Sequence, residues 1–135
     1  MTYENLLIAV KDYLKNNLTE TVEFGKYDVN AITALESPAV YIYAEPVSNN
    51  NLQNRVYYRE ARFSIFTTAA MEDPTLAIFS AIKLAENVER LMLDFPEGYT
   101  INYDNIETPF SFDSFYSDKA VCLYQFNIPY QPNLN

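Results

Sequence analysis

The chain has 135 residues, with 9 Lys plus Arg against 18 Asp plus Glu, and a formal net charge of −9. It contains no His, one Cys, no Trp and two Gly. The lack of His excludes a Ser-His-Asp triad, and with a single Cys it also excludes the ordinary zinc sites and an internal disulfide. Two isolated glycines cannot form a phosphate-binding glycine loop. We therefore expect a protein that is not an enzyme and that needs no cofactor or metal.

The length suits one domain, and a hydrophobic content of 49% is typical of a globular chain. We expect a single α+β domain over residues 1–135, with an irregular C-terminal tail over 129–135. No apolar run approaches the roughly 20 residues of a membrane-spanning helix. The first residues also lack the basic start of a secretion signal. These features favour an intracellular protein with no membrane partner.

The first half of the chain predicts one helix and three strands. Leu6, Val10 and Leu14 recur at helical spacing, which indicates an amphipathic helix. Thr2 can cap its N-terminus, and two asparagines at 16 and 17 can end it, because Asn tolerates the left-handed conformation. Strands are expected over residues 20–27, over 39–44 up to Pro46, and over 55–68, with a polar loop at 48–54.

The second half predicts a long helix and three further strands. The helix should run from Met71 to Phe95, because Asp73 can cap it and Pro74 suits its first position. Its expected apolar stripe is Ile78 or Phe79, Ile82, Ala85, Val88, Met92 and Phe95, widened by Leu76, Leu84 and Leu91. Strands should follow over residues 99–106, 110–116 and 120–130, the last two joined by a turn at Ser117 and Asp118.

The expected order is therefore α-β-β-β-α-β-β-β. Long runs of strands without helices imply antiparallel pairing. The predicted fold is an antiparallel or mixed sheet packed against a long central helix and an N-terminal helix. In the last strand, Cys122, Tyr124, Phe126 and Ile128 should share one side, with Cys122 as a small buried hydrophobe.

Paired carboxylates are the one catalytic device that the composition permits. Asp104, Glu107, Asp113 and Asp118 lie in the strand-rich end, and two of them could form an acid–base pair or a hard-metal site. Their spacing does not match an EF-hand calcium loop, and no second cluster completes a site, so we interpret them as solvent-facing and turn residues. The aromatic residues of 110–130 are accompanied by Lys119 as the only cation, so they lack the basic groove of a nucleic-acid stacking platform.

Charge is unevenly distributed along the chain. Residues 55–62 carry three Arg and one Glu, whereas residues 91–135 carry six acidic residues and one Lys. The plain interpretation is two solvated surfaces. The sharper hypothesis is a head-to-tail contact between copies, in which complementary charge sets the register. Its candidate subunit-interface residues are Arg55, Arg59, Arg62, Glu97, Asp104 and Glu107.

Five segments and the loop between two of them together carry a family resemblance. An N-terminal amphipathic helix leads to Pro-Ala-Val-Tyr-Ile-Tyr, a polar loop leads to the strand YYREARFSIFTTA, the helix DPTLAIFSAIKLAENVERLM follows, and the chain closes on AVCLYQFNIPY. This pattern, over nearly the whole chain, resembles the tail-terminator and tail-completion (head–tail joining) proteins of long-tailed bacteriophages. The resemblance implies a structural virion protein of the phage neck.

The resemblance also implies partners and a location. The chain would form a homo-oligomeric ring, commonly a hexamer, that is assembled in the host cytoplasm and joins the tail tube to the head connector. The loop of Ser48, Asn49, Asn50, Asn51, Leu52, Gln53 and Asn54 would contact a neighbouring neck protein. Genomic DNA would pass through an acidic lumen without specific binding, because like charge opposes adhesion to phosphates.

Two other classes of function remain open. A small acidic binding protein, such as a DNA mimic, would present carboxylates in spaced rows on one surface. A carboxylate-based enzyme would need a concave pocket with two facing acids.

Overall fold

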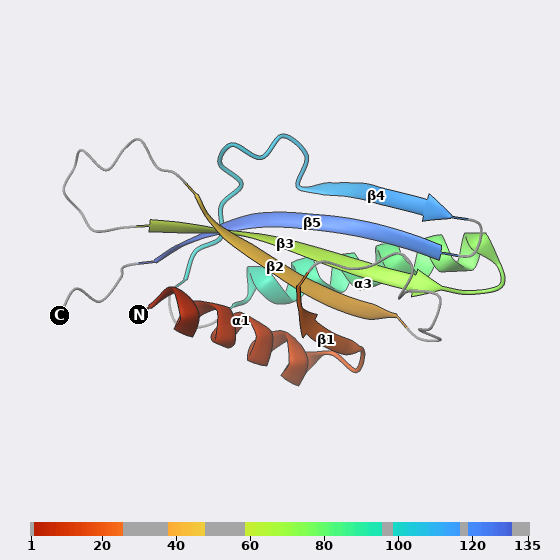
Figure 1. Ribbon diagram of the computed structural model, residues 1–135, viewed down its shortest axis with the longest axis horizontal. Coiled ribbons are helices and arrows are strands. Elements are labelled where there is room, and N and C mark those ends of the chain that lie inside the picture. The colour runs from red at the N-terminus through yellow and green to blue at the C-terminus, as the bar shows by residue number, and fades with distance from the viewer. Residues whose placement is uncertain (1, 26–37, 48–58, 96–98, 117–118, 131–135) are drawn as a thin grey trace.

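The fold is known from a computed structural model that describes residues 2–25, 38–47, 59–95, 99–116 and 119–130. The strands form one five-stranded sheet in the order β1-β2-β3-β5-β4 (Figure 1). β1 pairs with β2 in parallel, and every other pairing is antiparallel. This mixed sheet with two helices confirms the predicted α+β class. The elements are α1 (Tyr3–Asn17), β1 (Thr21–Phe24), β2 (Ala39–Val47), β3 (Arg59–Ala70), α3 (Pro74–Leu93), β4 (Phe110–Tyr116) and β5 (Lys119–Tyr130).

Both helices begin at the expected caps. The Asn5 backbone N–H donates to the Thr2 hydroxyl at 3.1 Å, at the start of α1. The Thr75 backbone N–H donates to the Asp73 carboxylate at 2.9 Å, and Pro74 occupies the first turn of α3, where its missing N–H has no cost. α3 therefore starts three residues after the predicted Met71, because the Asp73 cap fixes its first turn.

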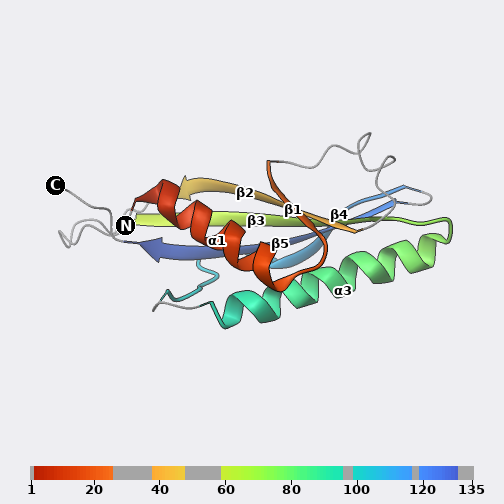
Figure 2. The ribbon, with the colours of Figure 1, turned by 90° about the horizontal axis from the view of Figure 1, so that it is seen from below.

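The core lies between the two helices and one face of the sheet. Leu6, Val10 and Leu14 of α1 are buried there, so the predicted helical face is confirmed. Figures 1 and 2 show α1 and α3 on the same side of the strands. Every second residue of the two central strands points into this core, which confirms the side predicted for β5; these residues are Ala61, Phe63 and Ile65 of β3, and Cys122, Tyr124, Phe126 and Ile128 of β5.

α3 packs on the sheet in two different ways along its length. Its N-terminal half presents Ala77 and Ala81 to Ala69 and Ala120 of the strands. We call this the alanine half of α3. Its C-terminal half instead buries larger side chains, namely Leu84, Val88 and Met92, and we call this the large-residue half.

The apolar stripe predicted for α3 is wrong at Leu76 and Phe79, whereas its alternative Ile78 and the predicted Ile82 are partly buried against the alanine cluster. Phe79 is 60% exposed and Leu76 is 53% exposed, whereas the smaller Ala77 and Ala81 are fully buried. The Thr67 hydroxyl of β3 donates to the Ala81 carbonyl oxygen at 2.9 Å, so helix and strand approach closely at this point. Figure 2 shows α3 converging on the strands toward its N-terminal end. Only small side chains fit such an approach, and the large ones turn outward.

Residues 99–106 do not form the predicted strand. Tyr99, Ile101 and Tyr103 alternate toward the core as a strand would, but only Asn102 makes a bridge, to Asn127 of β5. The chain then turns at residues 104–105, where Asn105 adopts a positive φ of 62°. This turn ends the alignment with β5 after a single bridge, so the segment is a loop.

Two strands continue through prolines. β5 runs through Pro129 to Tyr130, which pairs with Arg59, as the strand predicted over 120–130 requires, so the irregular tail predicted over 129–135 does not begin at 129. Residues 131–135 lie outside the described residues. The Asn127 N–H points away from β3, toward the 99–109 loop, and Pro129 two residues later has the same orientation. β2 likewise continues through Pro46, beyond the end of its pairing with β1. Neither proline removes a ladder bond.

Candidate interaction surfaces

The structure brings two of the predicted interface residues together within one chain. The Arg62 guanidinium donates from Nε to the Asn127 side-chain oxygen at 3.2 Å, and from Nη2 to the Asp104 carbonyl oxygen at 3.4 Å. Arg59 is exposed at the start of β3, and Glu107 is exposed in the 99–109 loop. The predicted interface residues Arg59, Arg62 and Asp104 therefore lie at one end of the molecule. Arg55, Glu97 and the whole 48–54 loop lie outside the described residues.

Two asparagines fasten this end. Asn102 and Asn127 exchange backbone hydrogen bonds of 3.0 and 2.8 Å. The Asn127 amide also donates to the Asn102 side-chain oxygen at 3.2 Å and to the Asp104 carbonyl at 2.8 Å. Asn102 in turn donates to the Glu60 carboxylate at 3.1 Å. We call this network the Asn102–Asn127 clamp. Asn127 is fully buried, so the clamp satisfies its polar groups and fixes the acidic loop against β5. Sequence reasoning missed it, because amides carry no charge or periodic signal.

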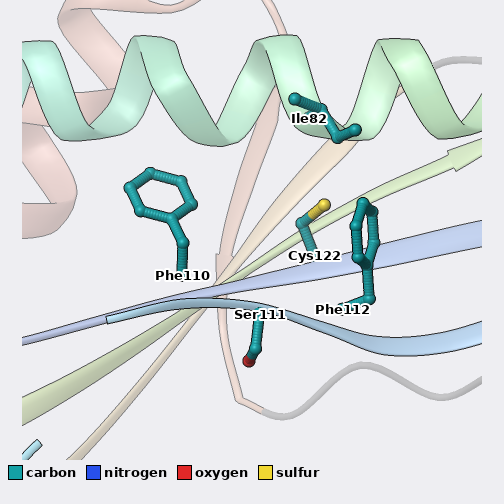
Figure 3. Close-up of a pocket in the computed structure, with 5 residues that line it drawn as sticks. All are labelled: Ile82, Phe110, Ser111, Phe112 and Cys122. Atoms are coloured by element: carbon teal, nitrogen blue, oxygen red, sulfur yellow. The ribbon is translucent and has the colours of Figure 1, made fainter. Parts of the chain in front are cut away.

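A pocket of about 240 Å³ opens between α3 and the edge strand β4. Its lining is Ile82, Phe110, Ser111, Phe112 and Cys122. Figure 3 shows Phe110, Phe112 and Cys122 pointing toward the helix, whereas Ser111 points away from it. The alanine half of α3 sits close to β3 and β5, which leaves the side of β4 uncovered. We call this feature the α3–β4 pocket.

The chemistry of the pocket is apolar. Burial raises the pKa of the Cys122 thiol from 9.0 to about 11, so the thiol stays protonated at neutral pH. A protonated thiol is a poor nucleophile and a poor metal ligand. Burial, and then the 2.9 Å hydrogen bond with Tyr103, likewise raise the pKa of the nearby Tyr124 hydroxyl. The α3–β4 pocket is therefore suited to bind an apolar group rather than to catalyse a reaction.

The opposite edge of the sheet carries a protruding apolar group. Phe24, at the end of β1, is 45% exposed, and the Lys11 ammonium lies 4.8 Å from the centre of its ring. Ile8, three residues before Lys11 on α1 and therefore a neighbour on the helix surface, is 44% exposed. We call Ile8, Lys11 and Phe24 the Phe24 edge. Large exposed apolar side chains thus lie at both edges of the sheet.

Among the described residues, no three or more His, Cys, Asp or Glu side chains gather as they would around a metal ion. In the same part of the chain, neither helix has the length and apolar character needed to cross a membrane.

The comparisons with known proteins bear on the fold alone. No family model and no curated protein matches this sequence. Nineteen chains of solved structures match it in shape. One of them, whose name carries no functional description, superposes with a TM-score of 0.59 at 13% sequence identity. The match covers 98% of this chain and 99% of that one. Such a likeness supports a common fold over the whole length.

Proposed function

We propose that this chain is a structural virion protein of the phage neck, which forms a ring that completes the tail and joins it to the head connector. One observation carries the proposal: large apolar side chains are exposed at two opposite edges of the sheet, with Phe24 at one edge and Phe112 at the other. A closed ring needs two different contact surfaces on each subunit, one for each neighbour.

The sequence supports the same function. The family resemblance spans nearly the whole chain, and the composition offers few groups for catalysis. The described carboxylates Asp104 and Glu107 are exposed on a surface loop. This arrangement gives no support to the carboxylate-enzyme alternative.

The partners of such a ring would be the tail tube on one side and the head connector on the other. With a net charge of −9 on each subunit, an acidic lumen would let genomic DNA pass without adhesion. Ring subunits of this kind, commonly six, would assemble in the host cytoplasm and remain in the virion. The 48–54 loop is our candidate for contact with a neck partner.

The test is electron microscopy of virions that carry this chain, labelled with a gold-conjugated antibody against it. We expect label at the junction of head and tail, and closed rings when the purified chain is mixed with isolated tail tubes. A chain that is absent from virions, and that binds neither tail tubes nor connectors, would exclude the proposed function.

A further inference from the structure

One apolar edge of the sheet has a hollow and the other has an exposed aromatic ring. The α3–β4 pocket has a volume of about 240 Å³ and is lined by Phe112 and Cys122, among others. The Phe24 edge offers a ring that is 45% exposed, with the Lys11 ammonium of the same chain beside it. An apolar cavity of about 150 Å³ in a protein already accommodates benzene, so this pocket has room for a phenylalanine ring.

Two glutamates of α3 and two lysines of α1 give charges of opposite sign near the two edges. Glu86 and Glu89 follow Ile82 by four and seven residues, so they continue along the same flank of α3 beyond the pocket. Glu89 is close enough to Tyr124 of β5 to contribute to the raised pKa of that hydroxyl. At the other edge, Lys11 lies over the Phe24 ring and Lys15 follows one turn later.

The charged end of the molecule is less suited to this role. The Arg62 guanidinium already donates to the Asp104 backbone carbonyl oxygen within one chain. The two residues are therefore adjacent and do not form two separate faces. A head-to-tail contact needs one surface on each side of the subunit, and the two apolar edges meet that need.

We infer that Phe24 of one copy inserts into the α3–β4 pocket of the next copy, with Lys11 and Lys15 facing Glu86 and Glu89. This inference names the subunit contact within the proposed ring and therefore rests on the proposed function. It replaces the arginine–carboxylate contact of the sequence hypothesis with an aromatic anchor flanked by charge.

The first experiment compares Phe24→Ser with Leu76→Ser by analytical ultracentrifugation. Leu76 is an equally apolar exposed residue, but it lies about 120° around α3 from Ile82 at 100° per residue. We expect Phe24→Ser to weaken self-association about 30-fold or more, as for a buried aromatic anchor, and Leu76→Ser to leave it unchanged. Circular dichroism of both variants checks that α1 and the sheet remain folded.

The second experiment captures the contact covalently. In a Cys122→Ala chain, which then has no other cysteine, Lys15→Cys and Glu86→Cys are combined and mildly oxidised, so that Phe24 and Phe112 are both kept. A head-to-tail contact gives a ladder of disulfide-linked dimers, trimers and higher species. The control chain carries Leu76→Cys in place of Glu86→Cys, and we expect it to remain largely uncrosslinked.

Each remaining outcome is decisive. A ladder that stops at dimers indicates an isologous contact and overturns the inference. Rings that form from Phe24→Ser as readily as from the parent chain, without cross-links between positions 15 and 86, overturn this contact and leave the neck function standing. A chain that neither associates nor cross-links at any concentration also overturns the contact, while antibody labelling of virions decides the function separately.

Discussion

In the alanine half of α3, Ala77 and Ala81 face the sheet, whereas the large-residue half uses Leu84, Val88 and Met92. Helix and strand approach closely in the first case and stand further apart in the second (Figure 2). The close approach is fixed by small side chains and the wider spacing by large ones. One helix therefore packs on the sheet in two ways, and substitutions that change side-chain volume should affect the two halves differently: removal of volume should destabilise the large-residue half, and addition of volume should destabilise the alanine half.

The largest expected effect is truncation in the large-residue half. Met92→Ala removes a fully buried side chain and leaves a cavity among Leu14, Val88 and other core residues. We expect a loss of about 2–5 kcal/mol in the free energy of unfolding. Urea denaturation followed by circular dichroism measures it. A loss no larger than that of an exposed substitution would show that this half of α3 is loosely packed.

Enlargement in the alanine half should have the next largest effect. Ala81→Leu forces extra carbon atoms into the space between α3 and β3, where Ala81 also accepts the hydrogen bond of Thr67. We expect it to lower the free energy of unfolding by about 1–3 kcal/mol, since overpacking displaces the backbone. The same denaturation experiment applies. Unchanged stability for Ala81→Leu would contradict the close approach.

Cys122 provides a chemical test of the alanine half. Its pKa of about 11 against 9.0 leaves about 100-fold less thiolate than in the unfolded chain at pH 8, so alkylation should be slower by at least that factor. The folded state holds the Cys122 proton to a higher pH than the unfolded state does, so the contribution of Cys122 to the free energy of unfolding is constant below pH 9 and declines toward pH 11. Subtracting the pH dependence of the Cys122→Ala chain isolates this contribution from that of other groups. Iodoacetamide kinetics that match those of a free thiol would argue against this burial.

The smallest expected effect is on the outer side of α3. Leu76→Ala removes apolar atoms that are already half in water and keeps a strong helix former. We expect a change within about 0.5 kcal/mol in the free energy of unfolding. This variant is the matched control for Ala81→Leu, because Ala81 lies five residues further along α3 and faces the sheet. A large loss of stability in Leu76→Ala would contradict the assignment of Leu76 to the solvent-exposed side of α3.

Much of the fold could be predicted from local signals. Thr2, Asp73 and Pro74 mark helix starts because capping is a local interaction, and alternation from Cys122 to Ile128 gives the buried side of β5. The face of α3 could not be predicted in the same way. Hydrophobicity alone favours Phe79 over Ala77, and only the distance between helix and sheet reverses this order.

The 99–106 segment shows a second limit. Tyr99, Ile101 and Tyr103 alternate as in a strand and are indeed partly buried. Whether such a segment pairs depends on the free edge of β5, where residues 119–124 are already bonded to β4. Only a single bridge, at Asn102, is formed beyond them. Competition for a shared edge cannot be read from a sequence.

The candidate surfaces were predicted least well. Charge counts along the chain separated Arg62 from Asp104 by 42 positions, but antiparallel pairing of β3 with β5 brings them into contact. The α3–β4 pocket arises because α3 packs on the central strands and leaves part of β4 exposed. No sequence motif predicts this arrangement. Cys122 was predicted as a buried hydrophobe, and it is one.

The register of the outermost strand has a consequence for unwanted assembly. β4 carries a bulge between Phe112 and Ser114, so one extra residue interrupts the regular spacing of its outward backbone groups. Another strand therefore cannot add to this edge in a continuous ladder. At high concentration the irregular edge would protect the chain from growing open-ended fibrils, and it leaves side-chain recognition as the means by which copies meet.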